Sequence, residues 1–120
     1  MLEVKSDMPG NVVSVVASGT VTGQDYEKVL IPAMEEKMAR FGKIRILYVF
    51  RRDFSGVTIG AMWNDAKAII KNLTTIEKAV VVSDIRWITG VSRFFSIFIP
   101  YPVKTYGMDM LDEAQAWIRE

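Results

Sequence analysis

Residues 44–56 read IRILYVFRRDFSG, and this stretch decides the fold. Its first seven residues are apolar apart from Arg45, a pattern typical of a strand that is covered on both faces of a sheet. Polar residues and Gly56 then end the strand. A second run of this kind, AVVV at 79–82, follows after a segment with helical spacing. Two buried strands separated by a helix predict a parallel sheet with a crossover helix between its strands.

The rest of the chain extends this arrangement in both directions. Further strands are predicted at 2–6, 12–18 and 103–106, and helices at 25–41, 59–73, 85–99 and 109–118. The order ββαβαβαβα predicts one α/β domain over residues 1–120, with a mixed, mostly parallel sheet and right-handed crossovers. We expect Pro32 to kink or restart its helix, Thr58 to begin the 59–73 helix and Asp109 to cap the last one.

The composition excludes several classes of function. The chain has neither cysteine nor histidine, so it lacks thiol nucleophiles, the usual general base near neutral pH and the commonest metal ligands. We therefore expect no enzyme activity, no cofactor and no metal. Charged residues interrupt the first ten residues, and no stretch is long and apolar enough to span a bilayer. We expect a cytoplasmic protein, at most peripheral at the inner face of the membrane.

The charge is unevenly distributed along the chain. Residues 43–108 carry ten basic and four acidic residues, a balance of +6, although the whole chain has a net charge of only +1. A basic central part favours an anionic partner, but solvated helix faces produce the same asymmetry. Nucleic acid fits poorly as that partner, because the basic residues are scattered and the pI is about 7.9.

The segment 85–102, IRWITGVSRFFSIFIPYP, carries the strongest functional signal. On a helix, Ile85 and Ile88 begin an apolar stripe that is wide enough to pack on the sheet. Trp87 begins a second stripe, turned by roughly a third of a circle, and this stripe needs another apolar partner. Four partners remain open: more of the core, a second copy of the chain, a lipid-like ligand, or a membrane surface.

Each of the last two partners has its own candidate residues. The wall of a ligand site is predicted from the aromatic and apolar side chains of Tyr26, Phe54, Trp63, Trp87, Val91 and Phe95. Contact with an anionic membrane is predicted for an apolar group with basic neighbours, namely Trp87, Phe94, Ile97, Phe98, Arg86, Arg93 and Lys104.

Polar residues follow the two buried strands. Because the carboxyl ends of parallel strands meet at one edge, Arg51, Arg52 and Arg86 are predicted to form an anion or headgroup site. The structural alternative is that Asp53 and Asp84 cap the following helices and pair with these arginines.

A set of spaced aromatic residues and aspartates over nearly the whole chain resembles the SpoIIAA-like family of STAS-like domains. The residues that carry the resemblance are Asp25, Tyr26, 52–56 (RDFSG), Trp63, 79–81 (AVV), Asp84, Trp87 and 116–117 (AW). This largely bacterial family implies a STAS-like fold, which is also likened to the CRAL-TRIO lipid carriers, and it does not imply an enzyme.

The resemblance also suggests a regulatory role of the kind played by anti-sigma-factor antagonists. Those proteins carry a phosphorylatable Ser or Thr within Asp-Ser-Ser/Thr-Gly, whereas this chain has Asp53, Phe54, Ser55 and Gly56 there. Ser55 and Thr58 remain as candidates. The leading hypothesis is a non-catalytic domain that binds an apolar or lipid-like molecule and reversibly contacts membranes through the 85–99 helix. The alternative is a homodimeric regulatory protein-interaction module.

Overall fold

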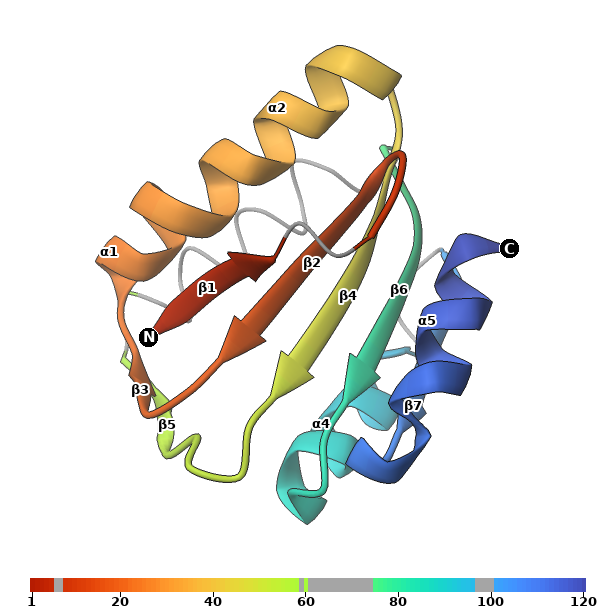
Figure 1. Ribbon diagram of the computed structural model, residues 1–120. Coiled ribbons are helices and arrows are strands. Elements are labelled where there is room, and N and C mark those ends of the chain that lie inside the picture. The colour runs from red at the N-terminus through yellow and green to blue at the C-terminus, as the bar shows by residue number, and fades with distance from the viewer. Residues whose placement is uncertain (6–7, 59, 61–74, 97–100) are drawn as a thin grey trace.

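The computed structural model describes residues 1–5, 8–58, 60, 75–96 and 101–120, without the side chains of 91–92 and 94–96. Within these residues, one sheet has the strand order β1-β2-β4-β6-β7 (Figure 1). Its strands are β1 (Leu2–Lys5), β2 (Val12–Ala17), β4 (Ile44–Phe50), β6 (Ile76–Val82) and β7 (Val103–Tyr106). β1 is antiparallel to β2, and the other neighbours are parallel. The predicted mixed, mostly parallel sheet is confirmed.

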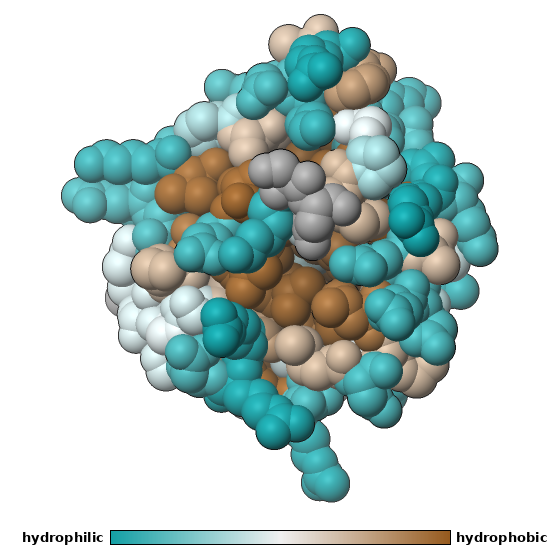
Figure 2. Space-filling view, in the orientation of Figure 1, coloured by the Kyte–Doolittle hydropathy of each residue, from teal (hydrophilic) through white to brown (hydrophobic). Residues whose placement is uncertain are grey.

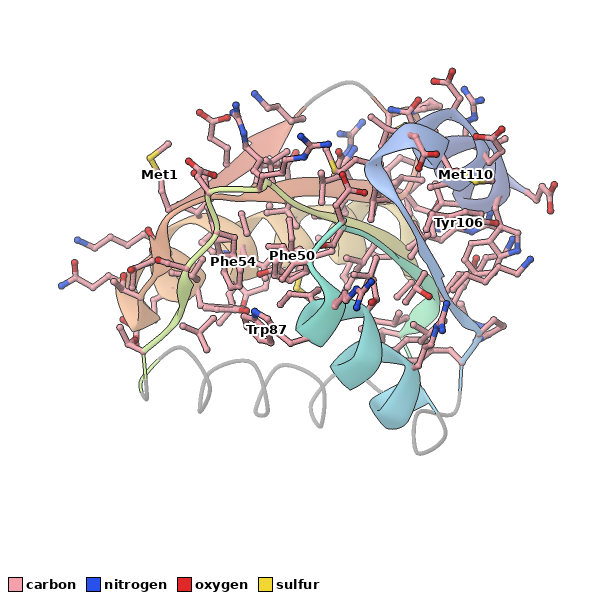
Figure 3. All side chains as sticks on the ribbon, turned by 90° about the horizontal axis from the view of Figure 1, so that it is seen from below. Met1, Phe50, Phe54, Trp87, Tyr106 and Met110 are labelled. Atoms are coloured by element: carbon pink, nitrogen blue, oxygen red, sulfur yellow. The ribbon has the colours of Figure 1, made fainter. Side chains whose placement is uncertain are left out.

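Helices cover both faces of this sheet. α2 (Ile31–Phe41) and α4 (Arg86–Ser96) lie on one face, and α5 (Leu111–Arg119) lies on the other, as Figure 3 shows for α4 and α5. The parallel strands follow one another across the sheet without reversal, so right-handed crossovers place their helices on the same side. Among the helices that the structure describes, only α5, which follows the last strand, lies on the opposite face.

The side chains of β4 alternate between two apolar clusters. Ile44, Ile46, Tyr48 and Phe50 belong to the cluster under α2 and α4, whereas Leu47 and Val49 face α5. This alternation confirms that the strand is covered on both faces, as its continuous apolar run predicts. On the α5 side, Figure 2 shows apolar side chains gathered in the middle of the face and ringed by hydrophilic ones.

β6 begins three residues earlier than predicted, at Ile76. The start of this strand is not apparent in the sequence, because Glu77 and Lys78 are polar. Their charged groups have partners, since Arg45 Nε donates to Glu77 Oε2 at 2.9 Å and Lys78 Nζ donates to the Trp117 carbonyl at 3.1 Å. Polar strand ends are tolerated where neighbouring elements supply hydrogen bonds.

The helix predicted from residue 25 begins earlier and in three parts. Thr22 caps α1 (Gly23–Asp25) through a capping box with Asp25, and a π-helical turn, η1 (Tyr26–Leu30), follows. α2 then starts with Pro32 in its first turn. Proline is accepted there because the first N–H groups of a helix have no helical partner. The expected restart at Pro32 is therefore confirmed.

Other expectations need correction. Residues 20–21 and 56–57 are outside the predicted strands, but β3 (Thr20–Val21) and β5 (Gly56–Val57) form a short parallel pair. Asp109 does not cap the last helix: it lies in a 3₁₀ turn, η2 (Met108–Met110), and Met110 precedes α5 without a side-chain hydrogen bond. The predicted 59–73 helix, with Trp63, lies outside the described residues except for the helical Gly60.

Candidate functional site

Four aromatic side chains form a continuous row at the edge of the sheet where the parallel strands end. We call Tyr48, Phe50, Phe54 and Trp87 the aromatic row. Their ring centroids are separated by 4.4 Å between Tyr48 and Phe50, 4.9 Å between Phe50 and Phe54, and 5.8 Å between Phe54 and Trp87. The row runs from the core to solvent, because Phe54 is 6% exposed and Trp87 is 53% exposed. Figure 3 shows Phe50, Phe54 and Trp87 on the side of the sheet where α4 lies.

The inner end of the row is fixed by the strand itself. Tyr48 and Phe50 are two residues apart on β4, so their rings share a face and stack with an interplanar angle of 1°. The Tyr48 hydroxyl lies 3.1 Å from the hydroxyl of Tyr26, which is buried in η1. The predicted ligand residue Tyr26 thus joins the row through a hydrogen bond and is not itself accessible.

Phe54 is held by the turn that follows β4. Its N–H donates to the Arg51 carbonyl at 3.0 Å, and the next residue, Ser55, donates from its N–H to the Gly19 carbonyl at 2.8 Å. The Ser55 hydroxyl lies 3.1 Å from the Thr20 hydroxyl. The turn therefore buries Phe54 and leaves Ser55 exposed. Phosphorylation of Ser55 or Thr58, which is also exposed, stays a prediction.

Trp87 is exposed because of its position at the start of α4. The Ser83 hydroxyl accepts the Ile85 N–H at 3.0 Å, and α4 begins at the next residue. Ile88 is 6% exposed and packs in the core, so Trp87, about 100° away around the helix, points outward. The orientations of Ile88 and Trp87 agree with the two predicted stripes at these two residues. The candidates Val91, Phe94, Phe95, Ile97 and Phe98 lie outside the described side chains.

A polar bridge crosses the same edge of the sheet. Asp84, after β6, accepts the Met108 N–H on Oδ1 at 2.9 Å, and Arg52 Nη2 and Nε donate to its Oδ2 at 3.2 and 3.3 Å. The Met108 N–H, followed by Arg52, holds the pKa of Asp84 below its ordinary value. The predicted pairing of Asp84 with an arginine is confirmed.

Asp84 does not cap the helix that follows it. Both oxygens of Asp84 accept hydrogen bonds from Met108 and Arg52, and Ser83 instead accepts at the start of α4. Asp53 is exposed and makes no hydrogen bond or ion pair with the part of the chain that the structure describes. The capping role expected for Asp84 is therefore wrong, whereas the helix that Asp53 was expected to cap, 59–73, lies outside the described residues apart from Gly60.

The three arginines of the predicted anion site are all exposed. Arg52 turns toward Asp84. The pKa of Glu3 on β1 is lowered mainly by its hydrogen bond and ion pair with Lys5, and Arg51 adds a smaller contribution to that lowering. Arg86 lies beside Trp87 in the first turn of α4. A shared anion site of these three residues stays a prediction.

Two further basic residues were predicted to accompany Trp87. Arg93 is exposed on α4, and its Nε donates to Thr105 Oγ1 at 3.4 Å. Lys104 lies on the other face of the sheet, because its Nζ is 5.1 Å from the centroid of the Trp117 ring on α5. Strand alternation turns Lys104 away from α4 and Thr105 toward it. Lys104 therefore does not belong to the surface around Trp87.

Sequence reasoning missed Tyr48 and Phe50 as parts of the site. It assigned both to a buried strand, which is correct, but the spacing of two aromatic residues at alternate positions also predicts stacked rings on one face. Among the described residues, no group of three acidic side chains is placed to hold a metal ion. No helix within the described ranges has the length and apolar character that crossing a bilayer requires.

Comparisons with known proteins agree with this architecture. A family model described as SpoIIAA-like matches residues 12–119. The fold is similar to that of a crystal structure of an uncharacterized protein from the DUF3478 family, with a SpoIIAA-like fold, from Shewanella loihica PV-4. The TM-score is 0.77 at 19% sequence identity, over 98% of this chain and 92% of that one. The comparison with curated proteins found no match.

Proposed function

Because the chain belongs to the SpoIIAA-like family, which is generally non-catalytic and points to a regulatory or interaction module, we propose that it is a binding domain without enzyme activity. Its ligand is an apolar or lipid-like molecule that packs against the aromatic row, and the domain reversibly contacts anionic membranes through the first turns of α4. The observation that carries this proposal is the half-exposed ring of Trp87, which continues a row of rings into the core.

The aromatic row supplies the apolar half of such a site. Transfer of the exposed apolar area of the Trp87 ring out of water favours an apolar partner there. Complete burial of an aromatic side chain contributes about 1.5–3 kcal/mol, so covering the exposed half of Trp87 contributes roughly 1 kcal/mol. An elongated apolar ligand gains more if it also reaches Phe54.

Basic residues on the same helix as Trp87 supply the charged half of the proposed site. Arg86 and Arg93 are exposed on the same helix, and each basic group near an anionic bilayer contributes about 1 kcal/mol. Together with Trp87 these terms reach about 3 kcal/mol, which favours reversible contact and is far below what stable anchoring needs. Attachment should therefore weaken as salt screens the arginines.

Vesicle flotation tests the membrane contact. We expect the protein to float with vesicles that contain phosphatidylglycerol and not with pure phosphatidylcholine vesicles. Trp87→Ser should lower the bound fraction about fivefold, because the ring and its insertion are lost. Phe41→Ser is the matched control, since Phe41 is 45% exposed at the end of α2, with Lys37 and Arg40 beside its ring.

Two outcomes would defeat the membrane proposal. One is wild-type protein that stays out of anionic vesicles. The other is an equal loss of binding in Phe41→Ser and Trp87→Ser, which would mean that any exposed aromatic ring with basic neighbours is sufficient. Light scattering on the same variants addresses the interaction-module alternative: a stable dimer that Trp87→Ser converts to monomers would assign the ring to a protein interface.

Native mass spectrometry of protein purified without detergent tests the ligand. We expect a fraction of the molecules to carry an added mass that organic extraction removes and that Phe54→Ala reduces. Protein that is consistently free of added mass, from cells grown in several media, would contradict ligand binding.

A further inference from the structure

A pocket opens at the end of the sheet opposite the aromatic row. It lies where β4 begins, between the turn that enters β2 and the carboxyl end of α5, and Figure 1 shows these two segments at the same end of the sheet. Its volume is about 280 Å³. A water molecule occupies about 30 Å³ in the liquid, so the pocket has room for a substituted phosphate group. Its lining consists of Pro9, Gly10, Asn11, Val12, Arg45 and Arg119.

Two guanidinium groups line this pocket, and no carboxylate does. Arg45 is held in place, because its Nε donates to Glu77 Oε2 at 2.9 Å and its Nη1 donates to the Ile118 carbonyl at 2.8 Å. Its Nη2 has no hydrogen-bond partner in the part of the chain that the structure describes. The Arg45 side chain is 19% exposed, so its remaining donors are oriented and partly shielded from water.

Arg119, in the last turn of α5, also lines the pocket. Among the described residues it makes no ion pair and no side-chain hydrogen bond. The carbonyls at this helix end do not compete for it, since those of Trp117 and Ile118 already accept hydrogen bonds from Lys78 and Arg45. Its guanidinium is therefore available to an external anion.

The third wall is a turn that other residues hold rigid. Gly10 has a φ of +67°, which glycine adopts without the strain that a side chain would bring. Lys37 Nζ donates to the Gly10 carbonyl at 3.0 Å, and Asn11 Nδ2 donates to the Lys43 carbonyl at 3.0 Å. A site whose walls are already ordered loses less conformational freedom on binding. The Lys37 ammonium group also adds positive charge beside this turn.

We propose that this pocket binds the phosphate group of a small molecule between Arg45 and Arg119. Guanidinium groups match phosphate oxygens in geometry and form paired, charge-assisted hydrogen bonds with them. Glu77 offsets part of the charge of Arg45, whereas Arg119 and Lys37 leave the surroundings positive. The pocket thus gives the domain a second binding site at the end of the sheet remote from Trp87.

NMR titration of the 15N-labelled protein with sodium phosphate, at constant ionic strength, tests the proposal. We expect saturable shifts of the Gly10 and Asn11 amides and of the Nε signals of Arg45 and Arg119, with a dissociation constant in the millimolar range. Arg119→Gln should weaken binding about tenfold. Arg119→Lys keeps the charge but not the paired hydrogen bonds, and should weaken it about threefold.

Controls separate this site from general attraction by positive charge. Arg86→Gln, an exposed arginine at the other end of the strands, should leave phosphate binding unchanged, and Arg119→Gln should leave vesicle binding unchanged. Shifts that grow linearly without saturation, or that Arg119→Gln does not alter, would overturn the proposal. Acetate that binds as tightly as phosphate would overturn the assignment to a phosphate group.

Discussion

The rings of Phe54 and Trp87 lie 5.8 Å apart, yet Phe54 is 6% exposed and Trp87 is 53% exposed. This pair marks the boundary between the core and the surface at the carboxyl edge of the sheet. Phe54 comes from the turn after β4 and Trp87 from the start of α4, so two crossovers meet at this contact. An apolar molecule that covers Trp87 would therefore also lie next to the turn after β4, which carries Phe54.

The two rings should differ sharply in their contribution to folding. Phe54→Ala removes a buried ring and should lower the free energy of unfolding by about 3–5 kcal/mol. Trp87→Ala removes a half-exposed ring and should lower it by about 1 kcal/mol. Urea denaturation followed by circular dichroism measures both. Equal losses in the two variants would place Trp87 in the core and remove the basis for an external partner.

Asp84 should make the stability of the protein sensitive to acid. Its pKa in the folded state is depressed below the ordinary value of 3.8, mainly by the Met108 N–H and then by Arg52. The stabilisation is therefore present above that value and is lost as the pH falls through the folded-state pKa.

Denaturation midpoints between pH 6 and pH 2.5, roughly the range in which a carboxylate with a lowered pKa titrates, measure this effect. Asp84→Asn should flatten the profile in its acid part. Arg52→Gln should flatten it less, because the Met108 N–H, the larger cause, remains. An acid profile of Arg52→Gln that is as flat as that of Asp84→Asn would contradict this order of causes.

The order of strands and helices along the chain and the mostly parallel sheet were predictable, because the buried strands are recognisable from their composition alone. The residues 44–50 and 79–82 are apolar in sequence, and the helical spacing between strands implies parallel crossovers. The feature that could not be predicted, the start of β6, depends on contacts with residues distant along the chain. The start of β6 is polar, and only its contacts with Arg45 and Trp117 explain why residues 77 and 78 lie in the sheet.

The candidate site was predictable only in part for the same reason. The apolar stripes of the 85–99 segment predict that Trp87 turns away from the sheet, and its exposure agrees. The partner of Asp84 across the β7–α5 turn, the Met108 N–H, could not be inferred, because a backbone donor leaves no mark on residue type. The prediction that Lys104 lies near Trp87 was wrong because successive residues of β7 point to opposite faces of the sheet, and Lys104 points to the α5 face.

Gly107 should resist substitution although its backbone conformation is ordinary. A Cβ at this position would lie 2.8 Å from Asp109 Oδ1 and 3.4 Å from Asp84 Oδ1, so Gly107→Ala forces one carboxylate to move. We expect a loss of about 1–3 kcal/mol in the free energy of unfolding, measured by urea denaturation.

A second substitution identifies the cause. Asp109→Ala removes the closer oxygen, and because Asp109 does not cap α5, this change alone should cost little. In the double variant with Gly107→Ala it should restore most of the lost stability. If the double variant is as unstable as Gly107→Ala alone, the clash with Asp109 is not the reason that glycine is needed.

Trp117 should distinguish the two lysines that flank it. Lys78 Nζ lies 4.7 Å and Lys104 Nζ 5.1 Å from the centroid of the indole, but only Lys78 also donates to the Trp117 carbonyl. A cation–π contact at an exposed site contributes about 0.5–1 kcal/mol, and a hydrogen bond adds about 1 kcal/mol.

Lys78→Met should therefore destabilise the protein by about 1–2 kcal/mol and Lys104→Met by about half as much. In a Trp117→Leu background the effect of Lys104→Met should vanish, whereas Lys78→Met should still cost the hydrogen bond to the helix end. Thermal or urea denaturation of the six variants in this cycle, including the parent proteins, measures both differences. Equal effects of the two lysines in the leucine background would show that the carbonyl of residue 117 does not distinguish them.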